Sequence, residues 1–383
     1  MSEHETAGRL SVPVSQASNR KPEAARFYAE PGLRLGLGLR PVLLLGLLAV
    51  LGGMFLLNLT LGSIDIPTRE VIEVLLGGEA SKKSWTNIVY KWRLPKAITA
   101  TLAGAALATS GLQMQTFFRN PLAGPFVLGI SSGASLGVAL IVLSSGTAAT
   151  GTMLASIALG SSLSIAAAAS LGAGIVMGVV LLVAQRVEST MTLLVLGLMI
   201  GYLTSSLVSL LLYFSIAEQI QAYINWTFGS FASVSWQEME IFAPAIAGGM
   251  MLALAISKPL NALLLGETYA RSMGLNVNRT RLAIIASTAI LAGTVTAFCG
   301  PIAFIGIAVP HLSRMLFGTS DHRLLIPATA ILGGIVALTA LLIAGMPGSG
   351  LVLPLNAVTA LIGAPVVMWV VLRRGNLHKG LAR

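Results

Sequence analysis

Few side chains in this 383-residue sequence stand in a pattern that could carry chemistry. The string GGEASKKS at residues 77–84 comes nearest to a phosphate-binding loop, but it lacks the glycine that must precede the lysine. The sequence has no HExxH zinc motif and no carboxylate pair suited to acid–base catalysis. His311 and His322, in the strings PHLSR and DHR, are better explained as helix-end residues than as metal ligands. We therefore predict no catalytic residue, no metal and no cofactor.

A charged stretch between two apolar runs is more informative. Residues 258–281 read KPLNALLLGETYARSMGLNVNRTR. Two short helices are predicted, over 261–265 and 267–273, with Gly266 between them and Gly274 closing the second. Such a charged, capped segment cannot lie in lipid, so it belongs at a membrane surface. Its positive excess predicts the cytoplasmic side.

The composition explains why a membrane is involved. The chain is 55% hydrophobic and only 10% charged, with a mean hydropathy of +0.85, whereas a soluble domain carries about 25% charged residues. Apolar runs of about 20 residues recur, which predicts helices rather than a β-barrel. The net charge of +10 favours topology signals and lipid headgroup contacts over nucleic-acid binding. Cys299 is the only cysteine, which excludes an intrachain disulfide and cysteine clusters.

The predicted fold class is all-α, a polytopic transmembrane helix bundle of about ten spans. Residues 1–38 are predicted to be a disordered cytoplasmic tail, 39–375 the transmembrane domain and 376–383 a cytoplasmic C-terminal tail. The expected spans are 40–61, 95–116, 122–143, 154–184, 190–214, 239–257, 282–299, 302–318, 324–344 and 355–372. Their many Gly, Ala and Ser residues predict close helix contacts in a compact bundle.

Ten spans place both termini on one side, and the basic residues agree with this. Beyond the tail, the lysines and arginines on that side are Arg119, Arg186, Lys258, Arg271, Arg279, Arg281, Arg314, Arg323, Arg373, Arg374 and Lys379. The opposite loops near 145–153, 300 and 345–354 carry no charge. The distribution predicts that both termini are cytoplasmic.

The loop over residues 62–94 is an exception, because it is predicted to face outward and yet is basic. Its positive residues are Arg69, Lys82, Lys83, Lys91 and Arg93. Positive charge there predicts a soluble partner with acidic docking residues. All 14 acidic residues of the chain fall in the tail, the loops or the span ends. Ion-coupled carriers usually need carboxylates within the membrane, so we expect the energy for transport to come from elsewhere.

Four blocks of sequence, taken together, point to a family. They cover residues 93–137, with RNPLAGP and LGISSGA; 266–277, with GETYARSMG; 304–334, with FIGIAVPHLSR and DHR; and 354–369. In order and spacing they resemble the membrane subunit of type II ABC importers for iron–siderophore, haem and vitamin B12. The resemblance covers roughly residues 40–375. It implies a ten-span permease that works as a homodimer or pseudo-dimer.

The resemblance implies a role for each matching residue. Five residues match the segment that docks on the ATPase: Gly266, Glu267, Ala270, Arg271 and Gly274. Arg93 and Lys96 match basic positions that face acidic residues of the binding protein. Structural roles are expected for nine residues in helix-end motifs: Arg119, Asn120, Pro121, Pro310, His311, Arg314, Asp321, His322 and Arg323.

The chain also departs from the family pattern. Leu341 and Gly345 stand where many relatives have an Asp and an Arg that help to dock the binding protein, and Asn356 stands where Gly is usual. The third docking charge is then either missing or supplied elsewhere. The candidates in the basic loop are Lys82, Lys83 and Lys91.

The expected function is ATP-driven import of an iron(III)–siderophore chelate across the cytoplasmic (inner) membrane by alternating access. Haem or vitamin B12 is the alternative substrate. The expected partners are an ABC ATPase subunit that binds the ATP, a periplasmic or lipid-anchored substrate-binding protein, a second permease copy or paralogue, and membrane lipid, but no nucleic acid. A secondary carrier without an ATPase and a structural scaffold are the alternatives from other classes. The charged stretch and the lack of intramembrane carboxylates count against the carrier.

Overall fold

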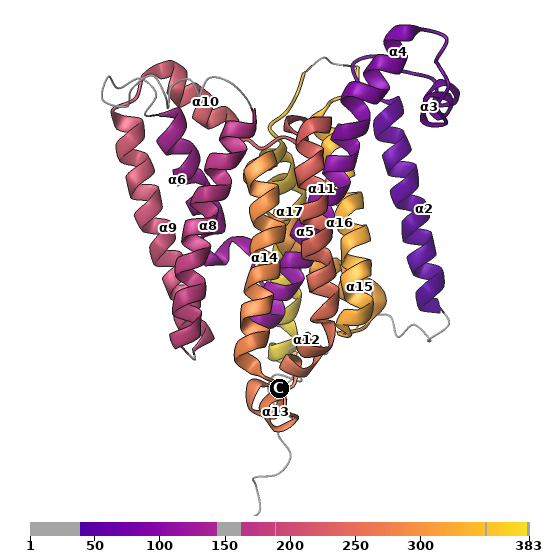
Figure 1. Ribbon diagram of the computed structural model, residues 1–383. Coiled ribbons are helices and arrows are strands. Elements are labelled where there is room, and N and C mark those ends of the chain that lie inside the picture. The colour runs from indigo at the N-terminus through magenta and orange to yellow at the C-terminus, as the bar shows by residue number, and fades with distance from the viewer. Residues whose placement is uncertain (1–38, 144–161, 188, 349–350, 381–383) are drawn as a thin grey trace, which may run out of the picture.

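A computed structural model describes residues 39–143, 162–187, 189–348 and 351–380, and the regular elements in these ranges are helices. Figure 1 shows the long helices running alongside one another between two ends. The predicted tail over 1–38 and residues 381–383 lie outside the described residues. So does the part of the fourth predicted span before residue 162.

Within the described residues, each predicted span overlaps a helix. In chain order these helices are α2 (Leu39–Thr60), α5 (Leu94–Phe117), α6 (Ile130–Val142), α8 (Ser162–Arg186), α9 (Thr190–Tyr213), α11 (Trp236–Ala255), α14 (Val277–Cys299), α15 (Ile305–Phe317), α16 (His322–Ala344) and α17 (Leu355–Gly380). Six of them are long and apolar enough to cross a membrane: α2, α8, α9, α11, α14 and α16. The helices α6, α15 and the apolar first part of α17 are shorter.

Shorter helices lie at the two ends of the bundle. The outer end, as we name the end predicted to face outward, carries α3 (Thr68–Leu75), α4 (Lys83–Ile88) and α10 (Ala217–Thr227). The opposite, inner end carries α12 (Ser257–Leu264) and α13 (Glu267–Ser272). The described residues also form a one-turn π-helix, η1 (Val89–Arg93), and two short 3-10 helices, η2 (Pro125–Leu128) and η4 (Phe231–Ser233).

Several predicted boundaries were wrong for local reasons. The span predicted from 122 begins at Ile130, because Pro125 starts the short turn η2 and Gly129 then takes a left-handed φ of 80°. The span predicted from 302 begins at Ile305, after Phe304 adopts a φ of 68°. Asn276 caps α14 by accepting from the Arg279 N–H, so this helix starts before the predicted residue 282. At the other end of the chain, α17 continues past the predicted end at 372.

The helix α5 lies at the centre and approaches its neighbours through glycines. A Cβ on Gly111 would overlap the carbonyl oxygen of Gly306 on α15 and lie 2.7 Å from its Cα. A Cβ on Gly104 would overlap the carbonyl oxygen of Gly333 on α16. These contacts join backbone to backbone, as small residues allow between membrane helices. They hold α5 firmly between α15 and α16.

Polar side chains of α5 are bonded inside the bundle. Gln113 donates from Nε2 to the Ser287 hydroxyl (3.0 Å) and accepts at Oε1 from Thr288 (3.2 Å), both on α14. Ser287 in turn donates to the Gly249 carbonyl on α11 (3.1 Å). A buried amide is tolerated in the membrane when its donors and acceptors are satisfied. The network therefore fixes the relative positions of α5, α11 and α14.

Candidate functional site

The predicted pair of short helices is present at the inner end. The first, α12, begins four residues earlier than predicted, because only Ile256 separates it from α11. Gly266 links the two helices with a φ of 114°. After α13, Gly274 has a φ of 83°, with hydrogen bonds from the Gly274 N–H to the Arg271 carbonyl and from the Leu275 N–H to the Ala270 carbonyl, both 3.0 Å. This is the Schellman arrangement, in which the left-handed residue favours glycine.

An ion pair ties α13 to the start of α14. The Arg281 guanidinium donates through Nη2 to both carboxylate oxygens of Glu267, at 2.7 and 2.8 Å. The Arg281 side chain is 2% exposed and that of Glu267 is 29% exposed. Arg281 also donates from Nη1 to the Val187 carbonyl after α8, at 3.3 Å. A charge this deeply buried depends on its partner, so the position of α13 is coupled to α14 and α8.

Asn261 fastens α12 to the start of α16. Its Nδ2 donates to Asp321 Oδ1 (2.6 Å), and its Oδ1 lies against the backbone N–H (2.8 Å) and the ring Nδ1 (2.7 Å) of His322. Because the Asp321 carboxylate can only accept, the amide nitrogen must face it and the amide oxygen must face His322. The other ring nitrogen of His322 bonds the Thr116 hydroxyl on α5 (2.8 Å). We name Asn261, Asp321, His322 and Thr116 the inner clasp.

The carboxylate in this clasp is held in its ionised form. Burial alone raises the pKa of Asp321. The hydrogen bonds from Asn261 and from the Arg323 backbone N–H, together with the positive charge of Arg323, outweigh this effect and lower the pKa below its usual value. A charged Asp321 is also favourable at the N-cap of α16, where it accepts from the Arg323 N–H at 3.0 Å.

The remaining motif residues gather around the inner end of α5. The Pro121 carbonyl bonds His311 Nε2 (3.0 Å), and Arg314 Nη1 donates to Gln115 Oε1 (2.6 Å), so the turn after α5 and α5 itself both hold α15. Asn120 accepts from the Leu122 N–H (2.9 Å) and shapes that turn. Two further neighbours are Arg119, which reaches the Leu263 carbonyl on α12 (3.5 Å), and Pro310, which is buried within α15.

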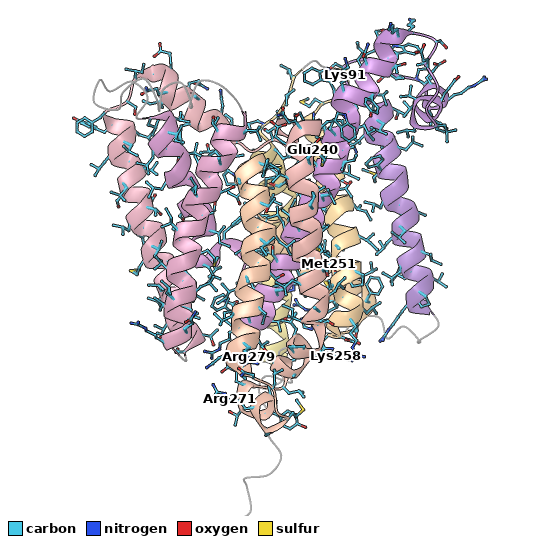
Figure 2. All side chains as sticks on the ribbon, viewed as in Figure 1. Lys91, Glu240, Met251, Lys258, Arg271 and Arg279 are labelled. Atoms are coloured by element: carbon cyan, nitrogen blue, oxygen red, sulfur yellow. The ribbon has the colours of Figure 1, made fainter. Side chains whose placement is uncertain are left out.

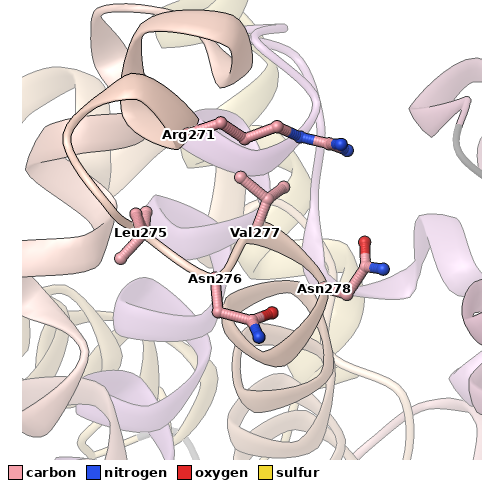
Figure 3. A pocket seen from close by; sticks show the side chains of 5 residues that line it. All are labelled: Arg271, Leu275, Asn276, Val277 and Asn278. Carbon is pink, nitrogen blue, oxygen red and sulfur yellow. The ribbon is translucent and has the colours of Figure 1, made fainter.

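A small hollow lies where α13 meets α14. It has a volume of about 180 Å³ and is lined by Arg271, Leu275, Asn276, Val277 and Asn278. Figure 3 shows the Arg271 side chain extending past Val277. Arg271 is exposed, in contrast to the buried Arg281. Figure 2 places Arg271 and Arg279 at the end opposite Lys91, so the exposed charges at the two ends of the bundle are separated by its full length.

At the outer end, Arg93 has an internal role that the sequence did not suggest. Its guanidinium donates to the carbonyls of Leu59 and Thr60 (both 2.8 Å) and of Ile64. Gly62 makes room for it, since a Cβ there would lie 2.7 Å from Arg93 Nη2. Arg93 therefore holds the turn after α2. The other residue predicted to face the binding protein, Lys96, is half-buried on α5.

Exposed positive charge at this end comes instead from the basic loop: Arg69, Lys82, Lys83 and Lys91. The same loop is braced by Glu70, which accepts from the Ser81 N–H (2.7 Å) and the Ser81 hydroxyl (2.5 Å). These bonds lower the pKa of Glu70.

The departure from the family pattern at Asn356 has a local explanation. Its side-chain oxygen accepts from the Ala303 N–H (3.1 Å), next to the left-handed Phe304. The Asn356 N–H donates to the Phe228 carbonyl (3.0 Å). A glycine could not make the side-chain bond. Many relatives carry a docking charge at two positions, one of which is Leu341 in this chain. Its side chain is apolar and buried in α16, so it adds no charge to the surface.

Sequence reasoning missed Asn261, Gln115 and Thr116. Asn261 interrupts an apolar stretch, and Gln115 lies in the polar string QMQT within an otherwise apolar helix. An amide in either setting is costly to bury unless it is bonded, and this signal could have identified both residues.

Replacing Asn261 with alanine is expected to loosen α12 from α16. The change removes three hydrogen bonds and leaves a buried ring nitrogen of His322 unsatisfied, at a cost of about 1–3 kcal/mol. We expect the midpoint of thermal unfolding of the purified protein to fall by about 2–6 °C. Asn278→Ala, at an exposed position of the same end, is the matched control. Equal midpoints for the two variants would show that the clasp contributes nothing.

Known proteins agree with this architecture. Residues 47–373 match the FecCD transport family. The vitamin B12 import system permease protein BtuC of Salmonella paratyphi A is 38% identical over 286 residues, which cover 74% of this chain and 83% of the relative. The corresponding protein of Salmonella typhimurium is 37% identical over the same length.

A solved structure supports the same assignment. It is described as an inward-facing conformation of a putative metal-chelate type ABC transporter, and it superimposes with a TM-score of 0.75 and 28% identity. The match covers 87% of this chain and 99% of that structure. Family membership implies an ABC ATPase and a binding protein as partners, and the subunit is not itself an enzyme. This chain belongs to the FecCD transport family and is the multi-pass membrane permease of a FecCD-type ABC importer.

Proposed function

We propose that this permease imports a metal chelate that a binding protein delivers to its outer end, by alternating access driven by a separate ATPase. An iron(III)–siderophore is the first candidate substrate. The similarity to the solved metal-chelate transporter supports it. Cobalamin is the second candidate, and the 38% identity to vitamin B12 permeases supports it. We further propose that the chain lies in the inner membrane with both termini in the cytoplasm and pairs with a second copy or a paralogue.

The arrangement of α12 and α13 carries this proposal. The pair protrudes from the inner end (Figure 1) and is joined by side-chain bonds to several long helices. Glu267 links it to α14, and Asn261 links it to α16 and, through His322, to α5. A push on this pair from an ATPase would therefore move several spans together. In this reading Gly266, Ala270 and Gly274 keep the pair rigid, and the exposed Arg271 contacts the ATPase.

Transport measurements test the proposal. The permease, its ATPase and its binding protein are reconstituted in vesicles, and uptake of an iron-labelled siderophore and of cyanocobalamin is followed with and without ATP. Uptake that requires ATP and all three components supports the proposal. Uptake without the ATPase, driven by an ion gradient, would establish a secondary carrier. A complex that moves neither chelate would favour a structural scaffold.

Charge reversal at the outer end tests the docking surface. Lys82, Lys83 and Lys91 are exposed there, and the outer-end basic residues Arg93 and Lys96 are proposed to add to the same field. Replacing the three lysines with glutamate is expected to weaken capture of the binding protein about ten-fold at low salt, with a smaller effect at high salt. Arg186→Glu, at the inner end, is the control. An unchanged affinity at every salt concentration would place docking elsewhere.

A further inference from the structure

A pocket rich in hydroxyl groups lies between α6, α9 and α10. Its volume is about 180 Å³, and six of its eight lining residues carry a hydroxyl. These six are Ser131, Ser132, Ser135, Thr204, Ser205 and Tyr223. No charged side chain lines it. No residue of the substrate pathway was identified from the sequence, so this pocket was not predicted.

Three of these hydroxyls differ from the usual pattern in membrane helices. A serine or threonine in such a helix commonly bonds a carbonyl one turn back, as Thr204 does with Ile200 (2.9 Å). In the part of the chain that the structure describes, the side chains of Ser131, Ser132 and Ser205 make no hydrogen bond. An unsatisfied hydroxyl in a membrane bundle is costly unless it meets water or a ligand. The three hydroxyls are therefore open to whatever enters the pocket.

The residues that line the pocket come from the outer end and from deeper in the bundle. The helix α6 has 13 residues, which give a length of about 20 Å, less than the roughly 30 Å core of a membrane. Figure 1 shows α6 reaching the outer end beside α10, so its N-terminal turn, which includes Ser131 and Ser132, lies deeper in the bundle. Tyr223 on α10 bonds Ser135 on α6, and both line the pocket together with Pro301. A substrate entering from the outer end would meet these hydroxyls on its way inward.

We propose that this pocket binds a polar edge of the chelate in transit, and that it selects chelates rich in uncharged amide, hydroxamate or hydroxyl groups. Hydroxyls both donate and accept, so they suit such groups. With no cation in the lining, the pocket does not suit ligands that present free carboxylates, such as haem. Its volume is below the roughly 300–1,000 Å³ of a complete small-molecule site, so it holds one edge of the chelate. The proposal rests on the import function proposed above.

Thiol labelling in the reconstituted complex tests the pocket. Ser132→Cys and Ser205→Cys are compared with Ser206→Cys, whose native hydroxyl bonds the Tyr202 carbonyl outside the pocket. The native Cys299 is buried and gives little background. A charged thiol reagent added from the outer side is expected to label the two pocket variants about ten-fold faster than the control, because the reactive thiolate forms readily in a polar pocket that admits water. A ferric trihydroxamate siderophore or cyanocobalamin, delivered by the binding protein, is expected to slow this labelling.

The outcomes separate the two proposals. Pocket labelling no faster than the control, or labelling that no chelate slows, haemin included, would overturn the binding site. Protection by haemin but by neither polar chelate would overturn the proposed selectivity. If only one of the two polar chelates protects the thiols, that chelate carries the groups that the pocket recognises. Labelling does not depend on completed transport, so absent uptake with protected thiols would overturn the import function alone.

A matched uptake measurement uses Ser131→Ala, Ser132→Ala and Ser205→Ala together. The expected result is a rise in KM for the transported chelate. Ser206→Ala with Ser209→Ala, whose hydroxyls bond their own helix, is expected to leave KM unchanged. Equal KM values for the two combined variants would contradict the pocket.

Discussion

Replacing Gly111 with alanine adds one methyl group to α5. We expect it to lower the stability of the bundle more than a methyl group added at any other position of this helix. The new Cβ would overlap the backbone of Gly306, and a backbone on a neighbouring helix cannot rotate away as a side chain can. Overfilling a tight interior typically costs about 1–3 kcal/mol, and we expect the upper end of this range because α5 is held on several sides. The single buried cysteine, Cys299, provides the measurement. Its thiol becomes reactive on unfolding, so a thiol-sensitive dye added during heating reports the midpoint.

Gly248→Ala on α11 is the matched control. A Cβ there would meet nothing within 4 Å. A glycine within a helix costs roughly 0.5–1 kcal/mol relative to alanine, so this control is expected to unfold at the same temperature or slightly higher. If Gly111→Ala unfolded at the same temperature as Gly248→Ala, the contact between α5 and α15 would be looser than the structure shows.

The contrast between these two glycines illustrates what the sequence could predict. Apolar runs of the length of a membrane span identify long helices, because the membrane imposes that length. The abundance of glycine predicts close helix contacts in general. It cannot say that Gly111 meets another helix while Gly248 does not, since that depends on tertiary contacts. The same limit explains the late start of α15, where Phe304 takes a left-handed conformation that no residue type announces.

At the inner end, the turns could be predicted from the sequence, but the side-chain bonds between helices could not. Gly266 and Gly274 follow from turn chemistry within a few residues, so both helix ends were predicted to within one residue. Arg281 was counted only as a basic residue at the membrane surface, because its pairing with Glu267 crosses a turn between two helices. The partners of Asn261 lie 60 and 61 residues away, which is beyond any local pattern. Local geometry was therefore visible in the sequence, and the bonds that couple helices were not.

Replacing Glu267 with glutamine is expected to uncouple ATP hydrolysis from uptake. The change leaves the Arg281 guanidinium, with a side chain only 2% exposed, without its counter-charge. Breaking a fully buried ion pair costs about 3–5 kcal/mol, and partial exposure of Glu267 reduces this figure. The cost falls on the contact between α13 and α14, so we expect uptake in vesicles to fall by at least about ten-fold, equivalent to about 1.4 kcal/mol. ATPase activity of the complex and the folded bundle are expected to persist.

Two further variants separate coupling from general damage. Thr268→Ala changes an exposed neighbour on α13 and is expected to leave uptake unchanged. Exchanging the pair, Glu267→Arg with Arg281→Glu, restores opposite charges across the same contact and is expected to recover part of the lost uptake. Recovery would show that the ion pair, rather than either residue alone, transmits motion from the ATPase. If Glu267→Gln kept full uptake, or lost ATPase activity and uptake in equal measure, α13 would not act as the coupling element.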